Sequence, residues 1–256
     1  MIDPPGPAGY AKPRRNRENC ALRIAIHQPH FLPWLGYLHR MAQVDAFVLL
    51  DHVQFERRNY QNRTMIRMNG AAHWLTVPVA QRSRDERIVD KEVDNTDSGE
   101  RSWGRVCART LQHIYGKAPF FREHAPALKA ILEARWEKLV DVNQAGLDFL
   151  REVFGIRTPL LRSSELGVQG AKADLVLEIC RATRADVLLA GMGGSRGYLD
   201  VAHFASNGVR IEWHQFQHPV YPQPGPQPFT PGLSAIDMLF HVGPQLLQRA
   251  PEMKAA

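Results

Sequence analysis

The sequence predicts an α/β fold with a mostly parallel sheet and a helical insertion or layer. Short apolar runs of strand length alternate with stretches of helical periodicity towards both ends of the chain, and a helical pattern fills the middle. The chain has 256 residues, of which 44% are hydrophobic and 23% charged. It can therefore bury a core, and its composition excludes a wholly disordered, collagen-like or coiled-coil protein.

We expect a disordered basic leader over residues 1–21 and a single α/β domain over 22–250. Residues 1–23 hold five basic side chains against two acidic ones, and the leader has no apolar stretch typical of a secretory signal. The cysteines are odd in number and far apart, which favours a reducing compartment. Cys107 and Cys180 fall within apolar helical patterns, as buried structural thiols do. We expect a cytoplasmic protein that does not bind membranes.

The first part of the domain predicts a βαβ unit. Apolar runs indicate strands over Ile24–Ile26 and Ala46–Leu50, and the spacing between them indicates a helix over Trp34–Gln43. Pro33 suits the first turn of that helix. Two strands joined by one helix should be parallel, with a right-handed crossover.

The middle of the chain is first polar and then helical. We interpret Gln54–Arg67 as a loop, rich in arginine and asparagine, that lines something anionic. His73–Val79 is predicted to be a strand that Pro78 places at the edge or end of a sheet. Apolar stripes predict a helical segment over about 102–153. The first stripe consists of Trp103, Val106, Leu111, Ile114 and Tyr115.

The last part of the domain returns to alternating strands and helices. The predicted strands are Thr158–Leu161, Asp186–Ala190 and Val209–Trp213. The predicted helices are Ala173–Thr183, Ala202–Ser206 and Ser234–His241, and we expect Ser234 to be the N-cap of the last one.

Two histidines follow the first predicted strand, in His27-Gln28-Pro29-His30. Ligands of open α/β sheets bind outside the carboxyl ends of strands, and imidazoles before a helix can hold a phosphate. The spacing resembles the H-x-G-H signature of nucleotidyltransferases and class I aminoacyl-tRNA synthetases, which implies a Rossmann-like, HUP-like sheet, although Pro29 replaces the glycine. We expect His27 and His30 to be catalytic and Gln28 to bind substrate. A bare H-x-x-H without function is the alternative.

A glycine-rich stretch follows the strand Asp186–Ala190. Glycines let backbone amides approach a ligand closely. The expected substrate- or cofactor-binding residues are Gly191, Gly193, Gly194, Ser195 and Tyr198. Asp200 is expected to orient or deprotonate an amine. The alternative is a purely structural turn, because the stretch matches neither the P-loop nor G-x-G-x-x-G.

The polar loop supplies a further group of expected binding residues. Guanidinium groups suit phosphates and carboxylates because they form paired hydrogen bonds. The expected binding residues here are Gln54, Arg57, Asn62 and Arg63. A solvated charged loop is the alternative interpretation.

The proline-rich stretch before the last helix contains the final candidates. His218 is expected to act as an acid or base, because histidine titrates near neutrality, with Tyr221 and Gln223 binding substrate. His214 and His218 have a zinc-compatible spacing. No cysteine or third histidine lies near them in the sequence, so we expect no metal site.

Taken together, these motifs resemble the WbqC-like protein family. The matching segments are Ile24–Phe55, Tyr60–Arg63, Trp74–Val79, Leu188–Asp200 and His218–Pro244. The resemblance implies a bacterial protein that transfers glycine, or a similar aminoacyl group, to an amine such as that of an amino sugar, in O-antigen or natural-product biosynthesis. Family members often carry asparagine at the position of His30, which makes His27 the firmer catalytic candidate.

Three kinds of function follow from the motifs and the resemblance. The first is an amide-forming aminoacyl transferase or ligase that works through an acyl-adenylate, with ATP and Mg²⁺ as cofactors and a small-molecule amine and an aminoacyl donor as partners. Aminoacyl-tRNA is the alternative donor. The second is a nucleotidyltransferase acting on a phosphorylated small molecule, and the third is a nonenzymatic sugar- or nucleotide-binding module. The sequence does not indicate an oligomeric state.

Overall fold

The computed structural model describes residues 21–244, so the expected leader lies outside the described residues apart from Ala21. By density of contacts the chain divides into two units of interleaved segments. The sheet unit comprises the residues up to 28, 40–52 and 158–216, and the helical unit comprises 29–39, 53–157 and the residues from 217 onwards. Whether residues 22–250 form a single domain depends on whether the two units unfold together, so the expected single domain stays a prediction.

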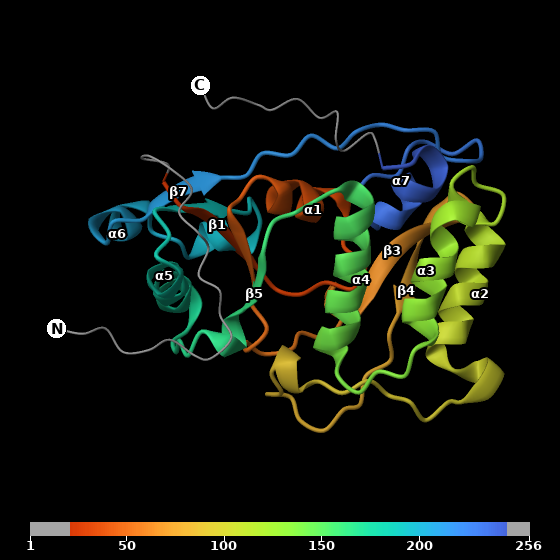
Figure 1. The fold of residues 1–256 in the computed structure, drawn as a ribbon, viewed down its shortest axis with the longest axis horizontal. Helices are drawn as coiled ribbons and strands as arrows, with labels where there is room; N and C mark the ends of the chain where they lie inside the picture. Colours follow the sequence, from red (N-terminus) through yellow and green to blue (C-terminus); the bar gives the residue numbers. More distant parts are fainter. Residues whose placement is uncertain (1–20, 245–256) are drawn as a thin grey trace. The chain divides into compact units, whose positions relative to one another are not determined.

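The sheet unit contains five parallel strands in the order β5-β2-β1-β6-β7 (Figure 1). In register, Ile24 of β1 lies opposite Ala46 of β2 and Leu188 of β6. This arrangement confirms the prediction of a Rossmann-like α/β fold. The strands are β1 (Arg23–His27), β2 (Ala46–Leu49), β5 (Leu160–Arg162), β6 (Val187–Ala190) and β7 (Arg210–Trp213).

The central strands are apolar because both faces of the sheet are covered. All residues of β2 and β6 are buried, as is typical of parallel strands between two layers. Helices α5 (Lys172–Thr183) and α6 (Val201–Ser206) belong to this unit, and α5 buries a stripe that includes Ile179 and Cys180. The connection from β1 to β2 runs through α1 (Leu35–Ala42), whose residues divide between the two units at Arg40.

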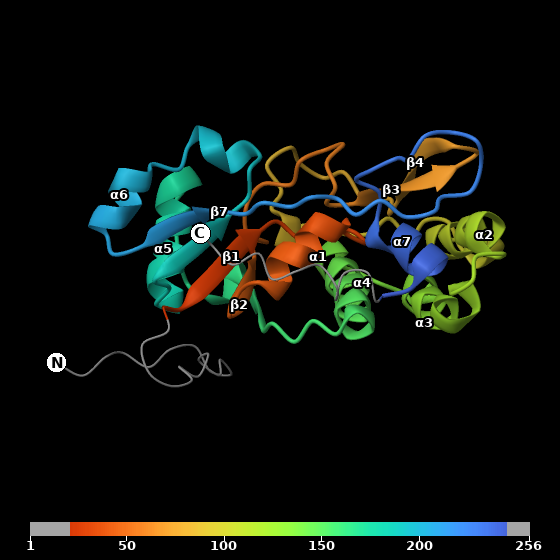
Figure 2. The same ribbon diagram turned by 90° about the horizontal axis from the view of Figure 1, so that it is seen from above.

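Within the described part of the chain, four helices lie wholly in the helical unit, together with a two-stranded hairpin. Helices α2 (Trp103–Tyr115), α3 (Phe121–Glu133) and α4 (Leu139–Phe154) occupy the expected helical segment, and α7 (Ala235–Val242) is the last described helix. Figure 2 shows the hairpin of β3 (Arg63–Met68) and β4 (Ala71–Thr76) on one side of these helices. Short 3₁₀ turns cover Ile88–Asp90 and Gly99–Arg101. Among the described residues, no helix is long and apolar enough to cross a membrane.

The hairpin corrects two predictions about the middle of the chain. The loop expected over Gln54–Arg67 ends early, since β3 begins at Arg63, and the strand expected over His73–Val79 ends at Thr76. The strand also pairs antiparallel with β3 and is not part of the main sheet. Asn69-Gly70 joins the two strands with both φ angles positive, at 52° and 79°. An Asn-Gly pair of this kind is a strong hairpin signal that the sequence interpretation overlooked.

The expected apolar stripe of α2 is only partly buried. Trp103, Leu111 and Tyr115 face the core, whereas Val106 is 44% exposed and Ile114 is half-buried. Val106 lies on the same side of α2 as the cations Arg105 and Arg109, both of which pair with Glu100. The stripe predicted the helix correctly, and the exposure of Val106 is ordinary because single exposed apolar side chains are common on protein surfaces.

Ser234 caps α7 by position but not by the expected side-chain bond. Its Oγ donates to the carbonyl oxygen of Leu32 at 2.7 Å, and Thr64 Oγ1 donates to the same oxygen at 2.9 Å. Leu32 has a φ of 43°, which is strained for a bulky residue. The two hydroxyls thus hold a strained backbone next to the His27–His30 segment, and the predicted capping bond is absent for that reason.

Candidate functional site

The carboxyl ends of the five parallel strands meet at one edge of the sheet unit. Polar side chains lie at four of these five strand ends, and a glycine follows the fifth strand. Arg162 closes β5, Asp51 and His52 follow β2, His27 closes β1 and His214 follows β7, whereas Gly191 follows β6. Because β1 and β6 pair directly, His27 and Gly191 end neighbouring strands. Open α/β sheets bind ligands at this edge, so we name it the carboxyl-edge site.

A buried arginine is packed against the glycine that follows β6. Arg40 is only 5% exposed, and its Nη1 occupies the space that a Cβ at Gly191 would need. Gly191 therefore allows a guanidinium to lie against the end of β6. Guanidinium groups stay charged and bind phosphate and carboxylate strongly. Sequence reasoning missed Arg40, since its apolar helical surroundings gave no sign that the side chain reaches a strand end.

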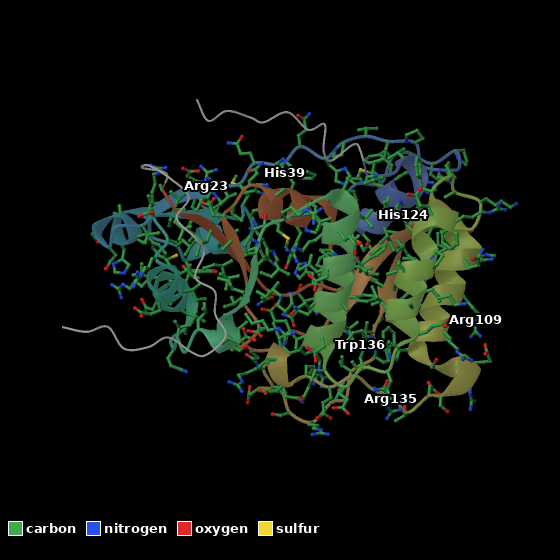
Figure 3. The ribbon with its side chains drawn as sticks, viewed as in Figure 1. Arg23, His39, Arg109, His124, Arg135 and Trp136 are labelled. Carbon is green, nitrogen blue, oxygen red and sulfur yellow. The ribbon has the colours of Figure 1, made fainter. Side chains whose placement is uncertain are left out.

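The ring of His27 is held in one tautomer. Its Nδ1 lies 2.9 Å from the carbonyl oxygen of Gln28, and a carbonyl can only accept, so the proton is on Nδ1. With the proton on Nδ1, Nε2 is the ring nitrogen that accepts a hydrogen bond in the neutral form and donates one only when the ring is protonated. Arg23, labelled in Figure 3, lies at the opposite end of β1 and pairs with Glu212 at 2.7 Å. The charge of Arg23 therefore does not add to the carboxyl-edge site.

A buried carboxylate organises the ends of β2 and β5. Asp51 Oδ1 accepts from Ser163 Oγ at 3.0 Å and from the Ser164 amide at 2.9 Å, and Oδ2 accepts from Ser164 Oγ at 2.7 Å. His52 Nδ1 lies 2.6 Å from Ser163 Oγ. Ser163 is almost fully buried in the 3₁₀ turn Ser163–Glu165, so it fixes His52 and is inaccessible as a nucleophile. The Leu-Leu-Asp-His end of the second predicted strand was the available sequence signal for this group.

The glycine-rich stretch forms an exposed 3₁₀ turn, Gly194–Gly197, leading into α6. Gly193 and Gly194 have open space where a side chain would lie, and Tyr198 is 41% exposed. Asp200 is the N-cap of α6, where Oδ1 accepts from the amides of Ala202 and His203. This capping role accounts for one oxygen of Asp200, and its expected role towards an amine stays a prediction.

Two basic side chains complete the far end of the carboxyl-edge site. His214, 7% exposed, extends the ladder of β7, because its amide donates to the Ala190 carbonyl at 2.8 Å. The guanidinium of Arg196 lies 5.6 Å from the ring of Trp213, the last residue of β7. Arg196 and Arg40 are the two guanidinium groups placed here at the ends of β7 and β6, and their positive charge suits an anionic ligand.

The carboxyl edge presents a guanidinium of the kind that binds phosphate, and its buried carboxylate is already occupied by hydrogen bonds. No cluster of three or more metal-ligating side chains occurs within residues 21–244. Asp51 is fully buried and its oxygens accept three hydrogen bonds, which leaves it little capacity for a cation. Arg40 against Gly191 fits a phosphate. Mg²⁺ is commonly carried by substrate phosphates with one or two carboxylates, so it would arrive with the nucleotide.

Neither described cysteine is suited to nucleophilic catalysis. Cys107 and Cys180 are buried, and burial raises the pKa of each thiol to about 12. The reactive form of cysteine is the thiolate, which is scarce at neutral pH when the pKa is raised. Acyl transfer through a thioester on either of these two cysteines is therefore disfavoured.

The predicted catalytic residue His30 and two predicted binding residues lie in the helical unit and support its structure. His30 is 7% exposed, and its ring lies 5.3 Å from that of Tyr37 and 5.4 Å from that of Tyr60. Asn62 Nδ2 donates to the Val77 carbonyl at 2.9 Å, and Gln54 Nε2 donates to the Arg84 carbonyl at 2.9 Å.

Two arginines of the predicted group differ in their surroundings. The Arg63 guanidinium lies 3.9 Å from the centre of the Trp74 ring and donates to the Arg58 carbonyl. Arg57 is exposed. Arg63 thus has a structural cation–π contact, and an exposed Arg57 is available to a ligand.

Tyr221 and Gln223, which we expected to bind substrate, belong to a buried network around Asp237. Asp237 is fully buried, and its oxygens accept from Tyr115 Oη and Tyr221 Oη, both at 2.8 Å, and from Gln223 Nε2 at 3.1 Å. Burial and the Asp237 charge raise the pKa of both tyrosines, so both remain donors. His218 lies beside this network, with its ring 6.2 Å from that of Tyr221 and its Nδ1 2.8 Å from the Pro219 carbonyl.

The sheet unit therefore brings together His27, Gln28 and the glycine-rich stretch from Gly191 to Asp200. The other predicted site residues are in the helical unit: His30, Gln54, Arg57, Asn62, Arg63, His218, Tyr221 and Gln223. The residues that the sequence did not suggest are Arg40, Asp51, His52, Arg162 and Ser163.

Acid should destabilise the fold partly through two half-buried histidines. Burial lowers the pKa of His39 (Figure 3) and of His241, and Arg67 lowers that of His241 further while Asp237 opposes the shift. The unfolded chain then binds more protons than the folded one below the ordinary histidine pKa of about 6.5. The two histidines should therefore not reduce the free energy of unfolding above that pH, and the free energy of unfolding should fall as the pH drops below it.

Urea unfolding at about pH 7.5 and about pH 5.5 checks this expectation. His241→Gln should flatten the pH dependence, whereas His73→Gln, which alters an exposed histidine on β4, should leave it unchanged. Equal pH slopes for the wild type and His241→Gln would count against a contribution from His241.

Comparison with known proteins gives two matches. Residues 28–249 match the WbqC-like protein family, a range that begins one residue after His27. The chain is 30% identical over 224 residues to "Uncharacterized protein Rv1507c" of Mycobacterium tuberculosis, which covers 86% of this chain and 94% of that protein. No solved structure matches the chain.

Proposed function

The chain belongs to the WbqC-like protein family, and from that premise we propose that it is an amide-forming enzyme. It joins the carboxylate of glycine or a similar amino acid to the amine of a small molecule such as an amino sugar, through an acyl-adenylate made from ATP. The observation that supports it most is the packing of Arg40 against Gly191 at the carboxyl edge, beside the end of β1.

The proposed reaction has two steps. In the first, a carboxylate oxygen attacks the α-phosphorus of ATP, and the bond to pyrophosphate breaks. In the second, the amine nitrogen attacks the acyl carbon, AMP leaves with the electron pair of the broken C–O bond, and the amine loses a proton. Negative charge builds up on the α-phosphate in the first step, so fixed positive groups accelerate it.

The residues of the carboxyl-edge site have distinct roles in this proposal. Arg40 pairs with phosphate oxygens, and its fixed position avoids reorganisation during the reaction. His27 donates from Nε2 when protonated and so stabilises the same charge. In this proposal His214 contacts the ligand at the end of β7. His52, which Ser163 holds in place, lies at the end of β2.

The test measures pyrophosphate release from ATP by the purified chain. Release that requires glycine and increases with an amino-sugar acceptor, together with formation of the glycyl amide, supports the proposal. Release that requires a phosphorylated small molecule instead contradicts it and favours a nucleotidyltransferase. Glycyl transfer from charged tRNA without ATP consumption contradicts the adenylate step. ATP binding without any turnover contradicts the enzyme and favours a binding module.

A further inference from the structure

The helical unit contains a cavity of about 360 Å³ outside the carboxyl-edge site. The turn of the β3–β4 hairpin, the end of α2, the proline-rich loop 224–227 and α7 surround it. A volume of this size suits a small organic molecule. The loop can close over the hairpin because Gly70 has no side chain, and a Cβ there would collide with Gln227.

The cavity wall combines basic, neutral polar and apolar residues. Arg67, His113 and His241 supply basic groups, and Asn69 and Gln227 supply neutral polar ones. Met68, Ile114 and Pro226 supply apolar surface, and none of the described residues that line the cavity is acidic. A ligand that matches this wall has an anionic head and an apolar body.

Within residues 21–244, no acidic side chain forms an ion pair with the buried charge of Arg67. Arg67 is 5% exposed, and it donates to two neutral acceptors, Gln223 Oε1 and the Gln227 carbonyl oxygen, the latter at 3.1 Å. Its Nε is buried and has no hydrogen-bond partner among the described residues. The guanidinium is linked to Asp237 through Gln223, whose Nε2 donates to Oδ2 at 3.1 Å.

The energetics of this arrangement indicate a missing partner. A guanidinium keeps its charge when buried, and neutral carbonyl acceptors satisfy its hydrogen bonds without supplying a counter-charge. Asp237 is already held by two tyrosine hydroxyls and Gln223, so its position is fixed. An anion entering the cavity would meet a charge that has already been desolvated, which is the favourable case for ion pairing.

We propose that this cavity binds a small organic carboxylate, with the carboxylate group on Arg67 and the apolar body against Met68, Ile114 and Pro226. A carboxylate fits better than a phosphate because a single guanidinium matches its planar shape and charge, and because much of the wall is apolar. In this account Gln223 and Tyr221 are positioning residues, since they hold Arg67 and Asp237 and do not touch the ligand. The inference is independent of the proposed amide-forming reaction.

The test uses four probes on the full chain, followed by the amide signal of Gly70 and the ring signals of His241 in NMR titrations. Butyrate should bind saturably, and 1-butanol, of nearly the same shape, should bind roughly tenfold more weakly or worse, because it lacks the charge. Butylamine and inorganic phosphate should not bind. Equal binding of butyrate and butanol, or tighter binding of phosphate, would overturn the proposal.

Two variants locate the site. Arg67→Met should weaken butyrate binding roughly tenfold or more. If that variant fails to fold, Ile114→Trp provides an independent test. Ile114 is half-buried at the wall, so the indole ring of tryptophan should fill the cavity and abolish binding. Arg105→Met removes an exposed cation from the same helix and should bind butyrate like the wild type. Butyrate affinity unchanged in Ile114→Trp would refute the assignment.

Discussion

Asp237→Ala should destabilise the protein by about 3–5 kcal/mol, the largest stability effect that we expect from a single substitution. Asp237 is fully buried, and three donors converge on its two oxygens. Removing the carboxylate leaves those donors buried without an acceptor and leaves the buried charge of Arg67 without its bridged counter-charge. Urea unfolding at neutral pH measures the loss.

Three controls separate this network from a general effect of losing a carboxylate. Tyr115→Phe and Tyr221→Phe remove one donor each and should cost less, about 1–2 kcal/mol, because Asp237 keeps its other partners. Asp148→Ala breaks a surface pair with Arg151 and should change stability by less than about 1 kcal/mol. Similar losses for Asp237→Ala and Asp148→Ala would show that the buried network contributes little.

His27→Ala should lower the turnover of the proposed reaction by about 10²–10³-fold, with little change in stability. His27 ends β1 at the carboxyl-edge site, and its fixed tautomer makes Nε2 the atom that meets developing phosphate charge. The measurement is kcat for glycine-dependent pyrophosphate release.

The matched control is His73→Ala, which removes an exposed histidine from β4 in the helical unit and should leave kcat unchanged. His27→Gln keeps a polar side chain but cannot carry the charge, so it should resemble His27→Ala. Wild-type kcat in His27→Ala would remove His27 from the mechanism.

The main sheet could be predicted because its signals are local. Apolar runs such as Ala46–Leu49 and Val187–Ala190 are strands whose both faces are buried, and the helices between them follow a regular period. The same alternation placed His27 and Gly191 at strand ends. Their closeness follows from the pairing of β1 with β6.

The remaining features depend on contacts between residues that are far apart in the sequence. Arg40 looks like an ordinary surface residue of a helix, and only the fold brings it against Gly191. Tyr221 and Gln223 looked like pocket residues, whereas the fold directs them to Asp237. Ser234 has the residue type of a helix cap, but its hydroxyl donates to the carbonyl oxygen of Leu32, whose backbone is strained. In each case a residue far away in the sequence determines which contact the side chain makes, and the local sequence does not reveal that residue.

ATP binding measured by calorimetry tests most directly whether the carboxyl-edge site holds a phosphate. A Cβ at Gly191 would displace the Arg40 guanidinium, whereas a Cβ at Gly197 meets open space in the neighbouring turn. We expect the wild type and Gly197→Ala to bind ATP alike and Gly191→Ala to bind it roughly tenfold more weakly or worse. Wild-type protein that does not bind ATP, or equal affinities for the two alanine variants, would contradict the account.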